Sequence, residues 1–271
     1  MKKVTSGLML RYLIIVLVIT GGFFTGCGSD SSDGSITADD VKGTWIKVWE
    51  GDPYAYSETG EADTLIFDIG DSDIQAVFYL ETAQVGGFKG TYSITDDEII
   101  VSVTETWNED FDWIDGNVPK WNAEIDEYSF PFTTGSGSLS ITGSDETVIE
   151  MDKISFSIQP ELTGYWEKEE ELMVMSPSRS PSRASAPAEY IIYLSFNGEY
   201  EREWDFDYYS GSWEASDYGN GFLRTIITDY TDSVDSFSDL DYGFLYHCSL
   251  EDESTLVIDS TAYHPYTPVA D

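Results

Sequence analysis

After about residue 40, apolar and polar residues alternate along most of the chain with a period of two. This period is typical of β-strands with one buried face and one solvated face, and helical periodicity is scarce. The first half predicts about eight strands joined by short polar connections: 41–50, 62–68, 73–82, 88–95, 98–107, 121–132, 138–142 and 147–158. The second half predicts seven clear strands and an eighth that is weak or missing.

The clearest alternation is NGEYEREWDFDYY, residues 197–209. Asn197-Gly198 is a favoured two-residue hairpin turn. After this turn, the acidic residues at odd positions share one face, and the residues at even positions, mostly aromatic, share the other. The stretch therefore predicts one strand with an acidic solvated face and an aromatic inner face. Arg202 is the cation on that inner face.

The chain also repeats itself. Gly164-x-Trp166 follows Gly43-x-Trp45 at an offset of 121 residues, and GSWEA (211–215) follows GTYSI (90–94) at the same offset. Three further segment pairs recur in the same order at slightly different offsets. The pattern favours an internal duplication with domains at 39–159 and 160–271.

Eight consecutive antiparallel strands suit a closed up-and-down barrel, which leaves no exposed strand edges. A β-sandwich is the alternative, because strand number does not distinguish the two. The early Gly-x-Trp, the L-x-F of residues 64–68 and the G-T-Y-x-I of residues 90–94 resemble the lipocalin-like domains of bacterial lipoproteins. The resemblance implies two consecutive antiparallel lipocalin-like β-barrels, each with an interior cavity for an apolar ligand. The first copy departs from that family because it lacks the late arginine that covers the tryptophan.

The first 26 residues have basic residues at the start, an apolar core at 12–24 and small residues before Cys27. This arrangement describes a secretory signal rather than a membrane span, which needs about 20 apolar residues. Phe24-Thr25-Gly26-Cys27 resembles the lipobox of bacterial lipoproteins, although Phe24 stands where leucine is common. The resemblance implies a signal peptide at 1–26, lipidation of Cys27 and a flexible tether at 27–38. Gly28 after the cysteine implies the outer membrane; an ordinary signal peptide with a chance cysteine is the alternative.

Charge limits the classes of partner. The chain has 51 acidic and 13 basic residues, for a net charge of −38. Nucleic acid and anionic lipid headgroups are excluded as partners, because both require clustered lysine and arginine. Contact with the membrane is therefore expected only through acyl chains on Cys27. The acidic surface either suits a saline or calcium-rich medium or reflects compositional drift. Aromatic residues make up 15% of the chain, enough to build a large core.

No catalytic constellation is evident. The chain has two histidines, His247 and His264, and lacks nucleophile-elbow, zinc-protease and phosphate-loop motifs. Cys248 remains alone once Cys27 is lipidated, and we expect it to be a small buried residue. The sequence therefore predicts no enzyme, no cofactor and no metal.

Two loops carry open alternatives. Residues 107–117 offer Asp110, Asp112 and Asp115 as calcium ligands, or they form a solvated acidic loop. Trp107, Trp113 and Trp121 either form a sugar-stacking platform or anchor the loop. The Ser/Pro/Arg-rich stretch 175–188 is predicted to be a disordered insertion, read either as a basic finger or as an unselected segment.

Taken together, these features predict that the chain is a non-catalytic, lipid-anchored lipoprotein of the cell envelope that binds a small apolar or amphipathic ligand. The second cavity would be lined by Tyr200, Arg202, Trp204 and Phe206, and the first by Ile74, Ala76, Phe78 and Leu80. Arg202 would pair with an acidic ligand head group, or with a local acid at the barrel rim. The alternative is a structural or protein-interaction module with side-chain-filled barrels, whose envelope protein partner contacts the loops at 107–121 or 175–189.

Overall fold

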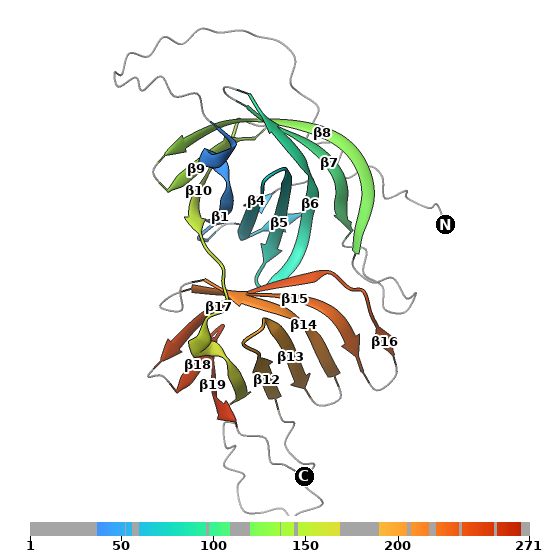
Figure 1. Ribbon diagram of the computed structural model, residues 1–271, viewed down its shortest axis with the longest axis vertical. Helices are drawn as coiled ribbons and strands as arrows, with labels where there is room; N and C mark the ends of the chain where they lie inside the picture. Colours follow the sequence, from blue (N-terminus) through green and yellow to red (C-terminus); the bar gives the residue numbers. More distant parts are fainter. Residues whose placement is uncertain are drawn as a thin grey trace, which may run out of the picture. The chain divides into compact units, whose positions relative to one another are not determined.

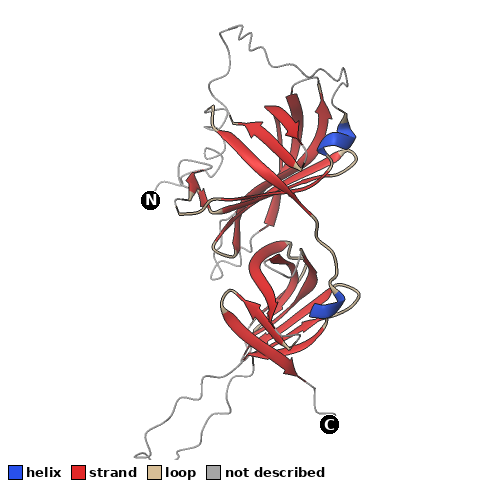
Figure 2. Ribbon diagram, turned by 90° about the vertical axis from the view of Figure 1, so that its left-hand side faces the viewer, coloured by secondary structure: helices blue, strands red, loops and turns tan. Residues whose placement is uncertain are grey.

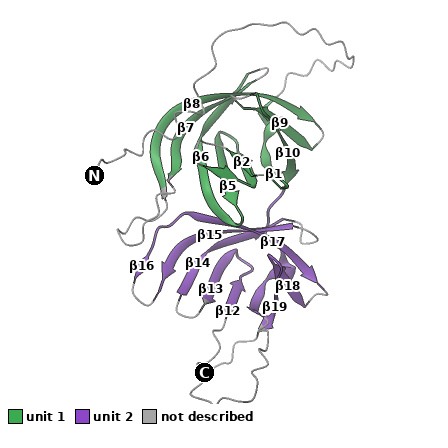
Figure 3. Cartoon of the chain, turned by 180° about the vertical axis from the view of Figure 1, so that it is seen from behind, with its two compact units in different colours: residues 1–109, 121–154 green, residues 110–120, 155–271 purple. Residues whose placement is uncertain are grey.

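The computed structural model describes residues 37–266, except for 52, 56–59, 96–97, 109–119, 136, 144–145, 169–189, 205–206, 217–220, 233–234 and 252–253. The described chain is almost entirely β-strand (Figure 2). It divides into two compact units (Figure 3): unit 1 is residues 1–109 and 121–154, and unit 2 is residues 110–120 and 155–271. The signal peptide, Cys27 and the insertion 175–188 lie outside the described residues. None of the helices in the described part of the chain has the length and apolarity that a bilayer span requires.

Unit 1 begins with the short helix α1 (Ala38–Val41) and contains eight long strands (Figure 1). They are β1 (Gly43–Val48), β4 (Thr64–Ile69), β5 (Asp73–Leu80), β6 (Ala83–Ile94), β7 (Glu98–Asn108), β8 (Lys120–Gly135), β9 (Ser138–Thr142) and β10 (Val148–Ile154). A small hairpin of β2 (Tyr54–Ala55) and β3 (Glu61–Ala62) accompanies them. Antiparallel pairs join the eight in the order β7-β6-β5-β4-β1-β10-β9-β8. All eight predicted strands of this half are present, but β6 begins five residues before the predicted start at residue 88, and β10 ends at Ile154, four residues before the predicted end at residue 158.

Unit 2 is a closed antiparallel barrel of eight strands. They are β11 (Gly164–Lys168), β12 (Tyr190–Leu194), β13 (Glu199–Trp204), β14 (Asp207–Ala215), β15 (Gly221–Thr231), β17 (Tyr242–Glu251), β18 (Thr255–Ile258) and β19 (Thr261–Tyr266). Each pairs with the next, and β19 pairs back with β11 to close the ring. The two-residue strand β16 (Ser236–Phe237) pairs with β15 outside the ring. The eighth strand, which the sequence pattern gave as weak or missing, is therefore present as β19.

The predicted single strand over residues 197–209 is two strands. β13 ends at Trp204, which lies opposite Asp207 at the start of β14. The polar–aromatic alternation continues through this tight turn without a glycine, proline or asparagine to mark it. The preceding turn is also one residue longer than predicted, because Phe196-Asn197-Gly198 lies between the hydrogen-bonded Ser195 and Glu199. Gly198 adopts a φ of 86°, which glycine tolerates without strain.

The two units repeat several structural details. In unit 1 the Trp45 indole N–H donates to the Val41 carbonyl at 2.7 Å, and in unit 2 the Trp166 indole donates to the Leu162 carbonyl at 2.8 Å. Leu162 belongs to the 3-10 helix η3 (Pro160–Leu162), which precedes β11 as α1 precedes β1.

A glycine at a β-bulge is the second shared detail. The register of β6 against β7 shifts at Gly90, and that of β14 against β15 shifts at Gly211. A Cβ atom at either glycine would collide with a backbone carbonyl of the facing strand, Ser102 in one case and Ile226 in the other. Both Gly-x-Trp pairs and both bulge glycines stand 121 residues apart, as the repeated motifs do.

Each unit has its own hydrophobic core. The largest fully buried side chains of unit 1 include Trp45, Phe67, Ile99, Leu139 and Met151. Those of unit 2 are Leu162, Leu194, Trp213, Leu223 and Leu256. Burying one such aliphatic side chain contributes about 1.5–3 kcal/mol, so each unit carries the means of its own stability.

Candidate functional site

The shared strand order allows the interiors of the two units to be compared position by position. The glycines of the two Gly-x-Trp motifs give a common starting point. Gly43 pairs through Ile69 with Ile74 in β5, and Gly164 pairs through Leu194 with Tyr200 in β13, so Ile74 corresponds to Tyr200. Two residues further on, on the same inward face, Ala76 corresponds to Arg202. The interior position that holds a methyl group in unit 1 therefore holds a guanidinium group in unit 2.

Arg202 extends into the interior of the unit 2 barrel, as the strand alternation predicted. Its Nη1 donates to the Tyr246 hydroxyl at 3.4 Å. Its guanidinium carbon lies 5.5 Å from the ring centroid of Tyr209, a cation–π distance. Tyr209 is on the neighbouring strand β14, whereas Tyr246 is on β17, so the contacts of Arg202 reach across the barrel.

The aromatic partners of Arg202 also differ from their counterparts in unit 1. Tyr209 stands two residues before the bulge glycine of β14, where Phe88 stands in β6. The registers of the last strands make Tyr246 the counterpart of Phe130. Unit 2 has thus exchanged one alanine and two phenylalanines for an arginine and two tyrosines at a single level of the interior.

Further tyrosines extend this polar cluster. The Tyr209 and Tyr230 rings lie 4.8 Å apart, and the Tyr230 hydroxyl donates to Asp232 at 3.0 Å. Tyr242 packs edge-to-face on Phe244, which stacks on Tyr246. Burial raises the pKa of Tyr230, and burial together with the neighbouring Tyr209 raises that of Tyr242. These phenols therefore stay neutral near pH 7 and can act as hydrogen-bond donors.

The other three residues predicted to line the cavity of unit 2 are not seen beside Arg202 in the polar cluster. Tyr200 is fully buried in the core, below the level of Arg202. Trp204 is the last residue of β13, and its side chain lies outside the described part of the structure. Phe206 also lies outside the described residues.

In unit 1, three of the four predicted cavity residues belong to the core. Ile74 and Ala76 are fully buried, and Phe78 packs partly buried against the same cluster. Leu80, the last residue of β5, is half-buried and is not part of that cluster. The interior of unit 1 is therefore filled largely by its own apolar side chains.

Two of the three tryptophans that the sequence singled out, Trp107 and Trp121, are described, and both lie in unit 1. Trp107 of β7 and Trp121 of β8 meet edge-to-face at 5.4 Å, and the Lys89 ammonium group lies 4.2 Å from the Trp121 ring centroid. The two rings therefore do not form a flat stacking platform. Asp110, Asp112, Trp113 and Asp115 lie outside the described residues. Within the described ranges, no three His, Cys, Asp or Glu side chains come together as metal ligands would.

Cys248 is buried on the inner face of β17, as expected of a small apolar residue. Burial raises the pKa of its thiol to about 12, so the group is protonated at physiological pH. A protonated buried thiol is a poor nucleophile, and Cys248 does not form a reactive site.

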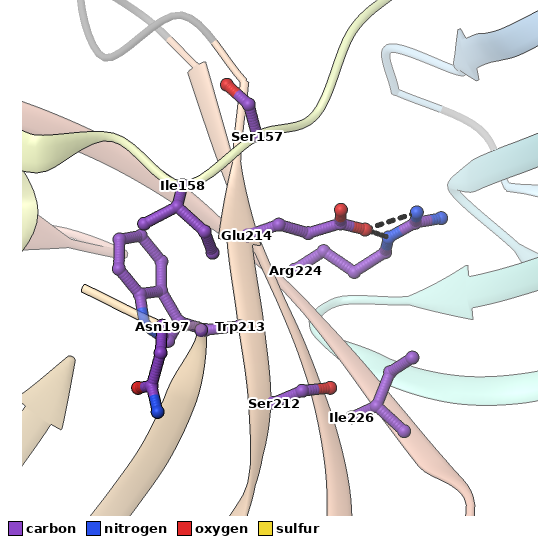
Figure 4. Close-up of a pocket in the computed structure, with 9 residues that line it drawn as sticks. Ser157, Ile158, Asn197, Ser212, Trp213, Glu214, Arg224 and Ile226 are labelled. Carbon is purple, nitrogen blue, oxygen red and sulfur yellow. Dashed lines mark hydrogen bonds and ion pairs between the residues drawn. The ribbon is translucent and has the colours of Figure 1, made fainter. Parts of the chain in front are cut away.

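A pocket that the sequence did not reveal lies on unit 2 (Figure 4). It has a volume of about 380 Å³ and is lined by Ser157, Ile158, Asn197, Gly198, Ser212, Trp213, Glu214, Arg224 and Ile226. Arg224 Nε donates to Glu214 Oε1 at 2.6 Å across β14 and β15. The sequence feature that could have pointed to this pocket is Arg224, because it is one of only five arginines in a strongly acidic chain.

No protein-family model, curated protein or solved structure matches the chain. The functional proposal therefore rests on the geometry of unit 2.

Proposed function

We propose that the protein is a non-catalytic binding protein whose unit 2 holds a small amphipathic ligand with an acidic head group. The observation that carries this proposal is Arg202, placed inside a closed barrel among tyrosines where unit 1 has Ala76 among phenylalanines. An exchange of three interior side chains at one level, on an otherwise repeated scaffold, favours a binding role for that level.

The chemistry around Arg202 suits a carboxylate or phosphate head group. A guanidinium offers several N–H donors in a fixed plane and bonds such anions in pairs, and neutral phenols such as Tyr246 and Tyr242 add O–H donors. Phe244, stacked on Tyr246, and Phe237, stacked on Tyr230, are partly buried against the same core and offer apolar surface for a hydrocarbon or aromatic tail. Ionic bonds inside a barrel are also stronger than at the surface, because the local dielectric is lower.

Unit 1, in this proposal, is a second barrel of the same lipocalin-like type that arose by duplication. Its eight strands follow the order of unit 2, and contacts between β7 and β8 bring its outer strands together: Thr106 Oγ1 donates to Glu124 Oε2 at 2.7 Å, and Trp107 meets Trp121. Its interior is filled by apolar side chains, which favours a structural role for this unit.

The chain is proposed to be held in the cell envelope by acyl chains on Cys27, facing the periplasm or the cell surface. The lipobox-like residues before Cys27 and the polar stretch after it support this placement. Labelled palmitate should be incorporated into the wild-type chain in a bacterial host and not into Cys27→Ser; equal labelling of both would refute the anchor.

The binding proposal is tested by titrating the full chain with oleate and with oleyl alcohol. We expect oleate to bind with at least tenfold higher affinity than the alcohol, and Arg202→Ala to remove that difference. Unit 1 carries alanine at the equivalent position, so the variant should fold normally, as its thermal unfolding would show. Lys168→Ala, on β11 of the same unit, removes one positive charge from an exposed position and is the matched control.

Unchanged oleate affinity in Arg202→Ala would contradict the assignment of Arg202. Equal weakening in the Lys168→Ala control would show that net charge, rather than the interior site, governs binding.

A further inference from the structure

The pocket of Figure 4 lies on the outer face of the unit 2 barrel, apart from the interior around Arg202. Glu214 and Arg224 occupy strand positions whose neighbours along the chain, such as Trp213 and Leu223, are buried in the core. Because alternate residues of a strand face opposite ways, Glu214 and Arg224 face outward. A ligand here would therefore be independent of a ligand in the barrel.

Two segments outside the strands form the walls of the pocket. Residues 155–158 lie against the end of β14, where Ser157 and Ala215 exchange two backbone hydrogen bonds of 2.8 Å. The turn between β12 and β13 contributes Asn197 and Gly198. A Cβ atom at Gly198 would lie 3.1 Å from the Ile158 side chain, so the glycine lets this turn approach the segment closely.

The charged groups of the pocket hold each other in place. Glu214 Oε1 accepts a hydrogen bond from Nε of Arg224 and forms an ion pair with Nη2, and Figure 4 shows the carboxylate extending toward the guanidinium. The guanidinium carbon lies 4.6 Å from the ring centroid of Phe156. Among the contacts of the described residues, Glu214 Oε2 accepts no hydrogen bond. The pair thus presents the Glu214 Oε2 acceptor at a fixed position in the pocket.

The pairing also restricts the charge of the ligand. Glu214 and Arg224 neutralise each other, so the lining holds no uncompensated charge for an ionic ligand, and the net charge of −38 repels anions further. The remaining lining combines the hydroxyls of Ser157 and Ser212 and the amide of Asn197 with carbon surface from Ile158 and Ile226. A compact, neutral ligand with several hydroxyls and apolar ring faces matches this lining.

We propose that this pocket binds one neutral pyranose unit, either a free monosaccharide or the end residue of a glycan. The volume of about 380 Å³ exceeds the roughly 300 Å³ at which small-molecule pockets begin. Glu214 Oε2 accepts a hydrogen bond from one sugar hydroxyl, while the exposed Ser212 hydroxyl bonds to a neighbouring one. Because this site is on the outer face of the barrel, it does not depend on the function proposed for Arg202.

The test is a titration of the full chain, followed by saturation-transfer NMR, with glucose, galactose, mannose, N-acetylglucosamine and their methyl glycosides. We expect at least one of these sugars to bind, and its affinity to fall at least tenfold in Glu214→Gln. Glu203→Gln, which removes an exposed carboxylate from β13 of the same barrel, is the matched control and should bind as the wild type does. Binding of a methyl glycoside indicates a glycan end, whereas binding of the reducing sugar alone indicates a free monosaccharide.

A second variant separates the pocket from the stability of the Glu214–Arg224 pair. Ser212 is exposed on the outer face of β14, and Ser212→Tyr fills the pocket without changing a core residue. Loss of sugar binding in this variant, with unchanged thermal unfolding, supports the site. Absence of binding by all eight sugars, or equal binding by wild type, Glu214→Gln and Ser212→Tyr, overturns the proposal.

Discussion

Arg202 and Ala76 occupy equivalent interior positions, yet their surroundings have opposite polarity. The Arg202 guanidinium lies among the Tyr209 ring and the Tyr246 hydroxyl, whereas Ala76 lies in a core of aliphatic and aromatic side chains. A charge is stable inside a protein only where polar groups or an ionic partner replace the lost water. The substitutions Ala76→Arg and Arg202→Ala should therefore lower the free energy of unfolding by unequal amounts.

We expect Ala76→Arg to destabilise unit 1 by about 3 kcal/mol or more, because an uncompensated buried charge costs that much. Arg202→Ala should cost much less, because the closely related interior of unit 1 accommodates alanine. Urea unfolding of the full chain followed by tryptophan fluorescence measures both. Equal costs for the two substitutions would show that the interiors do not differ as described.

Asp259 gives a pH-dependent effect at the same scale. Partial desolvation raises the pKa of its carboxyl above the usual 3.8, although the side chain is exposed and Oδ1 accepts the His247 backbone N–H at 2.9 Å. The folded state thus holds the proton more tightly than the unfolded state does. The stability associated with the protonated form is complete below pH 3.8 and is lost as pH rises through the raised pKa.

Asp259→Asn keeps an oxygen for the His247 N–H and cannot ionise. Relative to wild type, the variant should gain stability between pH 4.5 and pH 7, as measured by urea midpoints at the two values. A gain that is the same at both pH values, or smaller at pH 7, would show that folding does not raise the pKa of Asp259.

At the scale of elements, a short helix precedes the first long strand of each unit and is hydrogen-bonded to a tryptophan of that strand. The Trp45 and Trp166 indoles bond to the last residues of α1 and η3, and both bonds are buried. A typical buried hydrogen bond contributes about 1 kcal/mol, and losing the donor leaves a buried carbonyl without this partner.

Trp45→Phe and Trp166→Phe should each destabilise their own unit by about 1–3 kcal/mol, through the lost bond and the smaller ring. Hydrogen exchange of the amides of α1 and η3 would localise the effect to the unit that carries the substitution. Comparable loss of protection in both units from either substitution would contradict two separate cores.

The elements also show what sequence patterns can and cannot predict. Period-two alternation located the strands of unit 1, because one face of each is buried. It missed the boundary between β13 and β14, because the alternation continues from one strand into the next. It also missed β19, where Pro265 removes a backbone donor.

The candidate site was predicted in part for similar reasons. The inward orientation of Arg202 followed from the alternation within its own strand. Its partners Tyr209 and Tyr246 come from two other strands, and the position of Tyr209 depends on a bulge that alternation does not reveal. The Glu214–Arg224 pair depends on the register of β14 against β15, and 51 acidic residues gave no means of selecting Glu214 beforehand.

At the scale of the whole molecule, a net charge of −38 makes the folded chain repel itself. Salt screens this repulsion, since the Debye length falls from about 30 Å at 0.01 M to about 8 Å at 0.15 M. We expect the melting temperature to rise when NaCl is increased over this range, as measured by scanning calorimetry. Sucrose at equal osmolarity is the control for effects other than charge, and a melting temperature that falls with salt would contradict this account.

The central claim is that unit 2 holds an amphipathic acidic ligand at Arg202. Its most direct test is native mass spectrometry of the full chain, purified without added lipid and then incubated with oleate, in parallel with Arg202→Ala. We predict an added mass on the wild type that is released on denaturation and is absent or strongly reduced in the variant. A wild-type chain that carries no added mass before or after incubation would contradict the claim and would favour barrels filled by their own side chains.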